Sequence, residues 1–266
     1  MLKKGERGDG MDKLAVLRQY FGFPAFRAGQ QTLIDAVLSG RDALGVMPTG
    51  GGKSLCYELP ALLLPGMTLV VSPLISLMKD QVMALRNAGI PAGCINSSMS
   101  LDELRETYRD ARYGAYKLLY VAPERLLTDG FCSLAQELEI PLVAVDEAHC
   151  ISQWGQDFRP SYLKIVEFLQ RLPRRPAVAA FTATATAQVR ADIIRILQLH
   201  EPETVVTGFD RPNLRFEVLR PKDKRTALLQ LLSERRDKSG IVYCATRKTV
   251  EQVCGLLQEA GFAATR

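Results

Sequence analysis

The sequence has few of the residues that build metal sites and disulfide frameworks. Its 266 residues include two histidines, one tryptophan and six cysteines, and no two cysteines are spaced as Cys-x-x-Cys. Zinc sites combine closely spaced cysteine and histidine ligands, so this spacing excludes one. The cysteines are scattered through apolar runs, which is typical of reduced thiols in the core of a cytosolic protein.

The sequence also lacks targeting and membrane-spanning signals. No apolar segment follows the charged N-terminus, so a secretory signal is not predicted. A stretch without charge, residues 59–78, approaches the ~20 residues that span a bilayer. Pro60, Pro65, Gly66 and Pro73 interrupt it, and a helix cannot run through them. We therefore expect a helix end, a buried strand and a new helix there, and no membrane segment.

The overall composition is that of an ordinary globular protein, with 47% hydrophobic and 24% charged residues. The length fits one large domain, or one domain and part of another. A net charge of +5 is compatible with a polyanionic partner, although many proteins without such a partner carry as much charge.

Short apolar runs alternate with segments of helical periodicity, which predicts a parallel sheet covered by helices on both faces. We interpret the pattern as an α/β fold of the RecA-like, doubly wound type. One helix is predicted at 75–88, and a capping box formed by Ser100 and Glu103 opens another that ends near Gly114. The predicted strands are Ala43–Met47, Thr68–Val71, Lys117–Val121, Leu142–Val145, Ala177–Phe181, Thr204–Val206 and Gly240–Cys244.

The alternation of predicted strands and helices, and the places where it is interrupted, divide the chain into four segments. Residues 1–10 are polar and glycine-rich and are expected to form a flexible tail, and residues 11–207 the first RecA-like domain. Residues 208–221 interrupt the alternation as a linker. After 208–213 we expect a strand, a helix from about Lys224, the 240–244 strand and a helix at 248–260, and residues 222–266 are assigned to the beginning of a second RecA-like domain. Two or three strands cannot bury both faces of a sheet, so this domain is expected to be incomplete.

A glycine-rich loop, MPTGGGKS at residues 47–54, follows the first strand and opens a helix at Lys53. This is the context of a phosphate-binding loop, in which backbone N–H groups and a lysine face phosphate oxygens and a serine hydroxyl binds Mg²⁺. Met47 occupies a position where the general pattern has glycine, so a simple glycine-rich turn is the alternative. The residues expected to bind nucleotide here are Thr49, Gly50, Gly51, Gly52, Lys53 and Ser54.

Two adjacent carboxylates end the 142–145 strand, in the sequence Asp146-Glu-Ala-His149. Asp146 is expected to hold Mg²⁺ with Ser54, and Glu147 to orient and deprotonate the water that attacks the γ-phosphate. His149, in the same motif, is counted with Lys53 and the two acids as catalytic. The alternative is that Asp-Glu begins a solvated loop. Both motifs end strands of one sheet, where α/β proteins bind ligands, and this favours an ATPase.

The order and spacing of these motifs resemble those of the RecQ family of DNA helicases. The resemblance extends over nearly the whole chain after the tail. It is carried by FGFPAFRAGQ (21–30), MPTGGGKSLCY (47–57), SPLISLMKDQ (72–81), VAPERL (121–126), DEAHCISQWGQDFRPSY (146–162), FTATAT (181–186), FDRPNL (209–214) and SGIVYC (239–244). Gln156 and Glu58 depart from it, at positions where the family most often has His and Gln.

The resemblance implies roles for further residues. Phe23 is expected to stack on adenine while Arg27 and Gln30 contact its edge. In the loop after the DEAH sequence, Trp154, Phe158 and Arg159 are expected to stack on nucleic-acid bases. Elsewhere, Ser72, Lys79 and Arg125 are expected to contact a DNA strand.

The family further implies a 3′-to-5′ DNA helicase that uses ATP and Mg²⁺ to move along single strands. Single-stranded and partly duplex DNA are the expected partners, in the cytoplasm and at the nucleoid if the source is bacterial. An arginine from the second RecA-like domain completes the site in such motors, and its motifs are expected beyond residue 266. The 266-residue chain alone is therefore expected to bind ATP weakly and to hydrolyse it slowly. The alternatives are an RNA helicase, another superfamily 2 translocase, and a non-catalytic nucleotide- or DNA-binding module.

Overall fold

The structure is a computed structural model that describes residues 12–208 and 214–266. The predicted tail at 1–10, and residues 209–213 of the predicted linker, lie outside the described residues. The chain divides into two units, 1–210 and 211–266. Each unit is described by itself.

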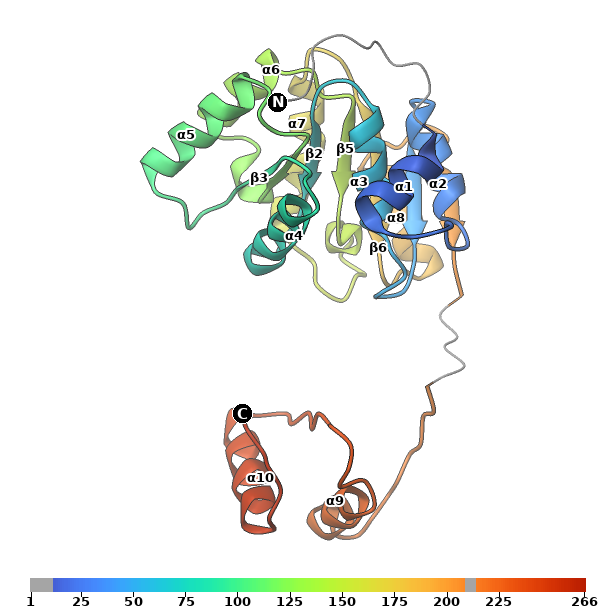
Figure 1. Cartoon of the computed structure of the whole chain (residues 1–266), viewed down its shortest axis with the longest axis vertical. Helices are drawn as coiled ribbons and strands as arrows, with labels where there is room; N and C mark the ends of the chain where they lie inside the picture. The colour runs from blue at the N-terminus through green and yellow to red at the C-terminus, as the bar shows by residue number, and fades with distance from the viewer. Residues whose placement is uncertain (1–11, 209–213) are drawn as a thin grey trace. The chain divides into compact units, whose positions relative to one another are not determined.

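The first unit is built on a seven-stranded sheet in the order β3-β4-β2-β5-β6-β1-β7 (Figure 1). All neighbouring strands are parallel. The strands are β1 (Ala43–Val46), β2 (Thr68–Val71), β3 (Ala92–Ile95), β4 (Leu118–Val121), β5 (Leu142–Val145), β6 (Ala177–Thr182) and β7 (Glu203–Val206).

Helices connect the strands and cover the sheet. The helices of the first unit are α1 (Lys13–Phe21), α2 (Gln30–Leu38), α3 (Leu55–Leu63), α4 (Ile75–Asn87), α5 (Leu101–Arg112), α6 (Asp129–Glu137), α7 (Lys164–Arg171) and α8 (Ala187–Ile196). Three short 3-10 turns lie between them: η1 (Pro123–Arg125), η2 (Ala148–Ile151) and η3 (Pro160–Leu163).

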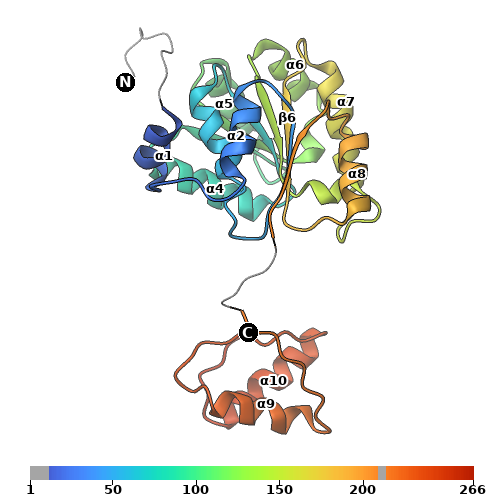
Figure 2. The same ribbon diagram turned by 90° about the vertical axis from the view of Figure 1, so that its right-hand side faces the viewer.

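The two faces of the sheet follow the two-residue period of the strands. On β5, Val143 and Val145 pack into the core shared with α5, α6, α7 and α8. Leu142 and Ala144 pack into the core shared with α2, α3 and α4. Figure 2 shows α2 on one side of the sheet and α7 and α8 on the other. The fully apolar strands are buried on both faces, as expected of a parallel sheet.

Most of the predicted elements of the first unit are confirmed. Six predicted strands match β1, β2, β4, β5, β6 and β7 to within one residue at either end. The capping box of α5 is present, because Ser100 Oγ accepts from the Glu103 N–H and the Glu103 carboxylate accepts from the Ser100 N–H. The helix after the glycine-rich loop begins at Leu55 instead of Lys53, with Ser54 as its N-cap.

Strand β3 was not predicted. Its sequence, Ala-Gly-Cys-Ile, includes Gly93 and only one large apolar residue, so its apolar run does not stand out. The glycine lets the Tyr116 ring pack closely on the strand, because a Cβ there would lie 3.0 Å from the ring.

The second unit differs from its prediction. Its described residues form α9 (Lys224–Ser233) and α10 (Arg247–Glu259), near the predicted positions, and no strand. The predicted strand Gly240–Cys244 is wrong for this structure: the segment is irregular, and Tyr243 is 91% exposed. A strand is stable only when it pairs with another, and residues 214–266 offer no partner strand. The assignment of this unit to a second RecA-like domain stays a prediction.

The uncharged stretch 59–78 folds as expected, into the end of α3, strand β2 and the start of α4. Over the described residues, no helix is both long enough and apolar enough to cross a bilayer.

Candidate functional site

The glycine-rich loop leaves the end of β1 and enters α3. Gly50 and Gly52 have φ values of +77° and +82°, which residues with a side chain rarely adopt. A Cβ at Gly51 would lie 2.8 Å from the carbonyl oxygen of Pro48, and one at Gly52 would lie 2.3 Å from Gln30 Nε2. The loop conformation therefore requires the glycines that the sequence supplies.

Met47, the departure from the general loop pattern, is accommodated beneath the loop. Its side chain is buried in the core between the sheet and α2, α3 and α4. Lys53 Nζ donates to the carbonyl oxygen of Met47 over 3.2 Å. The ammonium group is thus held across the loop, beside the N-terminus of α3, where the helix dipole also favours an anion.

Asp146 and Glu147 follow β5, one strand away from β1 across β6. The backbone continues the sheet by one residue, since the Asp146 N–H donates to the Val71 carbonyl over 2.9 Å. Glu147 then turns sharply with φ +47° and ψ +44°, and its N–H donates to Asp146 Oδ1 over 3.0 Å. Left-handed backbone at a glutamate is uncommon and concentrates at functional sites. Tyr162 supports the turn by donating its hydroxyl to the Asp146 carbonyl over 2.8 Å.

His149 connects this turn to β6. Its Nδ1 lies 3.2 Å from Glu147 Oε2 and 2.9 Å from Thr182 Oγ1. The hydrogen bond to His149 lowers the pKa of Glu147, and contacts with the Cys150 thiol and Glu147 raise the pKa of His149. Burial, with the neighbouring charge of Glu147, raises the pKa of Asp146 to about 6. A cation beside Asp146 would offset that burial.

The segment before α2 closes one side of the site. Arg27 Nη1 donates to the Gly50 carbonyl over 2.5 Å, and its guanidinium carbon lies 5.9 Å from the centroid of the Phe23 ring. Gln30 Nε2 donates to the Gly52 carbonyl over 3.1 Å, and Gln30 Oε1 accepts from the Arg27 N–H. Phe23 and Arg27 are exposed, whereas Gln30 is buried against the loop. In this structure Gln30 therefore braces the loop.

These parts enclose a cleft of about 440 Å³. Of the nucleotide and catalytic residues predicted from the sequence, ten line it: Phe23, Arg27, Gln30, Thr49, Gly50, Gly52, Lys53, Ser54, Asp146 and Glu147. Sequence reasoning missed Ala25, Leu55, Leu77 and Gln81. Leu77 and Gln81 are four residues apart on α4 and so share a helix face, but the sequence does not say that this face meets the cleft.

The donor set of the cleft fits a nucleoside triphosphate with Mg²⁺. Ser54 and Asp146 offer the hydroxyl and carboxylate oxygens that Mg²⁺ prefers. Gly51 and Gly52 carry no side chain, so phosphates can approach the loop backbone; a Cβ there would collide with the Pro48 carbonyl oxygen or the Gln30 side chain.

The loop at residues 152–159, which we call the aromatic loop, follows η2. Trp154 is 75% exposed, and with the half-buried Phe158 it lines a hollow of about 400 Å³. Arg159 is engaged internally: it forms an ion pair with Asp157 and donates to the Pro73 carbonyl over 3.1 Å. Of the three residues predicted in this loop, Trp154 presents the most open ring or guanidinium face.

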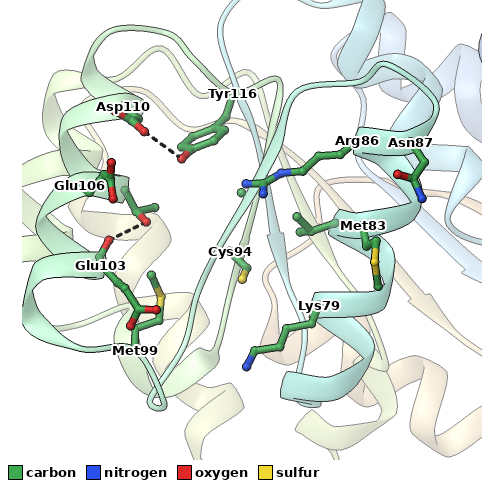
Figure 3. Close-up of a pocket in the computed structure, with 13 residues that line it drawn as sticks. Lys79, Met83, Arg86, Asn87, Cys94, Met99, Glu103, Glu106, Asp110 and Tyr116 are labelled. Carbon is green, nitrogen blue, oxygen red and sulfur yellow. Dashed lines mark hydrogen bonds between the residues drawn. The ribbon is translucent and has the colours of Figure 1, made fainter.

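The other predicted DNA contacts are dispersed. Ser72 differs from its prediction: its side chain is buried and the hydroxyl has no hydrogen-bond partner among the described residues. The reason is that Ser72 continues β2, with its N–H donating to Val121, so its side chain stays within the sheet layers. Arg125 is half-buried in η1. Lys79 lines a separate hollow of about 640 Å³ between α4 and α5, where Figure 3 shows it across from Glu103.

Residues 27–193 match the family model described as "DEAD/DEAH box helicase". These residues hold the glycine-rich loop, the DEAH sequence and the aromatic loop. The chain belongs to this family. Within it, the resemblance to RecQ helicases is confirmed. The chain is 48% identical over 240 residues to the ATP-dependent DNA helicase RecQ of Bacillus subtilis, covering 90% of this chain and 41% of that protein. It is 45% identical over 251 residues to RecQ of Pasteurella multocida, covering 94% of this chain and 40% of that protein.

Solved helicase structures share the fold. A crystal structure of the DUF1998 helicase MrfA bound to DNA matches with a TM-score of 0.71 and 17% identity, over 93% of this chain and 36% of that one. A hypothetical ATP-dependent RNA helicase from Sulfolobus tokodaii matches with a TM-score of 0.59 and 21% identity, over 92% and 71%. The chain spans about two fifths of the length of the RecQ relatives.

Proposed function

We propose that this chain is the ATP-binding part of a RecQ-type DNA helicase that couples ATP hydrolysis to 3′-to-5′ movement along single-stranded DNA. The observation that carries the proposal is the meeting of two motifs in one cleft. Lys53 and Ser54 reach it from the end of β1, and Asp146 and Glu147 from the end of β5. The identity to proteins named DNA helicases supports DNA over RNA as the partner.

The geometry supports a role for each residue. Lys53 and the loop N–H groups would stabilise the negative charge of the phosphates. Ser54 and Asp146 would hold Mg²⁺, which when bound supplies positive charge to the same phosphate oxygens. Glu147, ionised because its pKa is lowered, would accept a proton from the attacking water. His149 holds the Glu147 carboxylate in place and ties it to β6 through Thr182.

The proposal includes the domain assignment: a first RecA-like domain at 11–207, a linker at 208–221 and part of a second domain at 222–266. Movement along DNA needs closure of two such domains on the nucleotide, and this chain spans about two fifths of its RecQ relatives. We therefore expect the 266-residue chain alone to bind ATP-Mg²⁺ weakly and to hydrolyse it slowly. The protein would act in the cytoplasm, and at the nucleoid if the source is bacterial.

Calorimetric titration of the 266-residue chain with ATP and Mg²⁺ tests the nucleotide site. Lys53→Ala should abolish binding. Glu147→Gln should keep binding and lower the slow hydrolysis by about 100-fold or more, because the general base is lost. Binding by Lys53→Ala equal to that of the unaltered chain would contradict the site. Fast hydrolysis stimulated by single-stranded DNA would contradict the expectation that the chain alone is a poor ATPase.

Trp154 is the only tryptophan in the chain, so its fluorescence reports on the DNA side of the proposal. A single-stranded DNA oligonucleotide should quench it by stacking, and RNA of the same sequence should do so more weakly. Equal quenching by RNA would instead favour an RNA helicase or another superfamily 2 translocase.

A further inference from the structure

The start of the aromatic loop is fixed by one buried serine. Ser152 has no solvent exposure, and its Oγ accepts from the Trp154 N–H over 3.2 Å. The same hydroxyl donates to Asp192 Oδ2 over 2.7 Å. A hydroxyl that both donates and accepts sits in one orientation, so Ser152 relays the position of Asp192 to the backbone of Trp154.

Asp192 is a buried carboxylate on α8. Its second oxygen, Oδ1, accepts from Arg195 Nη2 over 2.7 Å. The bonds from Arg195 and Ser152 lower the pKa of Asp192, so it is ionised at neutral pH. Burial of a charge is costly unless it is paired and hydrogen-bonded, and here both oxygens are engaged. One of these two partners belongs to the aromatic loop.

Backbone hydrogen bonds also fix the aromatic loop on both sides of Trp154. Gly155 donates its N–H to the Ser152 carbonyl over 3.0 Å, and a Cβ at Gly155 would lie 2.3 Å from the His149 carbonyl oxygen. The far end of the loop is held as well, by the Arg159 N–H bonded to the Cys150 carbonyl over 2.9 Å. Trp154 is therefore the exposed tip of a loop whose two ends are fastened.

We propose that Asp192 is a positioning residue, which holds Trp154 through the Ser152 hydroxyl. The positioning follows from contacts on the loop itself. Its importance for DNA binding rests on the proposed function, because it assumes that Trp154 contacts DNA.

Fluorescence of Trp154 in the 266-residue chain tests the positioning without any ligand. Asp192→Ala and Ser152→Ala should each lower the steady-state anisotropy of Trp154 and increase its quenching by acrylamide. The double variant should show no further change, because both substitutions break the same relay. Asp192→Asn should retain the signal of the unaltered chain, since its amide oxygen can still accept from Ser152. An unchanged anisotropy in Asp192→Ala, or an equal loss in Asp192→Asn, would overturn the proposal.

Asp102→Asn is the matched control, because Asp102 is an exposed helix aspartate in an ion pair with an arginine at the same i,i+3 spacing. Thermal unfolding of every variant separates a repositioned loop from a destabilised fold. If Asp192→Ala does not fold, Ser152→Ala carries the same test.

Addition of single-stranded DNA then tests whether this positioning matters for DNA binding. The DNA affinity measured by Trp154 quenching should fall by about threefold to thirtyfold in Asp192→Ala, part of the ~1–3 kcal/mol that stacking of a base on one aromatic ring contributes. If the unaltered chain shows no quenching by DNA, the proposed function fails, and the anisotropy without DNA still decides whether Asp192 positions the loop. Unaltered DNA affinity in a variant with altered anisotropy would show that the position of Trp154 does not matter for DNA binding.

Discussion

Glu58 lies on α3, one turn beyond the glycine-rich loop, and is buried. Its Oε1 accepts from the Tyr120 hydroxyl over 3.3 Å, a single neutral hydrogen bond. Burial, with a contribution from the charge of Asp146, raises the pKa of Glu58 from 4.5 to about 7. RecQ relatives were expected to have glutamine here, which would make the same hydrogen bond without a charge. The glutamate therefore makes the stability of the site dependent on pH.

The pKa of Glu58 is higher in the folded chain than in the unfolded chain, so its contribution to stability is fully present below pH 4.5 and is lost as the pH rises through about 7. Glu58→Gln should have little effect at pH 4.5 and stabilise the chain at pH 8, by at most on the order of 3 kcal/mol. Urea unfolding at several pH values measures the difference. Glu167→Gln, at an exposed glutamate on α7, is the control. A Glu58→Gln effect that does not grow with pH would contradict the prediction.

At the scale of the element, β1 depends on its contact with α2 and β6. Gly45 lies in the middle of β1, where its neighbours are Phe181 on β6 and Val205 on β7. A Cβ there would lie 2.8 Å from Phe181 Cδ1 and 3.0 Å from Leu33 Cδ1. Glycine normally weakens a strand, but here it lets α2 approach the sheet closely. Gln30 and the loop glycines are positioned by this approach, since α2 begins at Gln30.

Gly45→Ala should therefore destabilise the first unit by about 1–3 kcal/mol, the cost of overpacking a core. It should also weaken ATP binding, because α2 would move away from the phosphate loop. Gly208→Ala is the control, since a Cβ there meets nothing within 4 Å. Thermal unfolding and calorimetric ATP titration measure the two effects. Stability equal to that of the unaltered chain would show that Leu33 and Phe181 can yield without cost.

At the scale of the whole molecule, the buried core belongs to the first unit. Its three clusters of buried side chains draw on both faces of the sheet and on α1. In the described residues 214–266, Leu257 is the only side chain that is buried, while Phe216, Ile241 and Tyr243 are exposed. The first unit thus has the core of an independently folding domain, and the described part of the second unit does not.

A shortened chain that ends at residue 210 should accordingly keep the main thermal transition of the 266-residue chain. Differential scanning calorimetry of the two chains makes the comparison. A midpoint lower by more than about 4 °C, which corresponds to 1 kcal/mol or more for a unit of this size, would show that residues 211–266 stabilise the first unit.

The sequence alone determined six of the seven sheet strands, the capping box of α5 and the glycine-rich loop. These depend on local patterns: a run of apolar residues, a serine three residues before a glutamate, and glycines at positions that need positive φ. It failed at β3, whose Ala-Gly-Cys-Ile sequence has only one large apolar residue, and at the 240–244 strand, whose stability depends on a partner.

Only the tertiary structure decided which predicted residues meet. It brought Lys53 and Asp146 together across β6, closed Gln30 onto Gly52, and buried Ser72 within the sheet layers. It also joined Ser152 to Asp192, which lie forty residues apart. Such contacts follow from strand order and helix packing, and no local pattern encodes these. The glycine-rich loop is thus local in its conformation but depends on distant elements for the cleft around it.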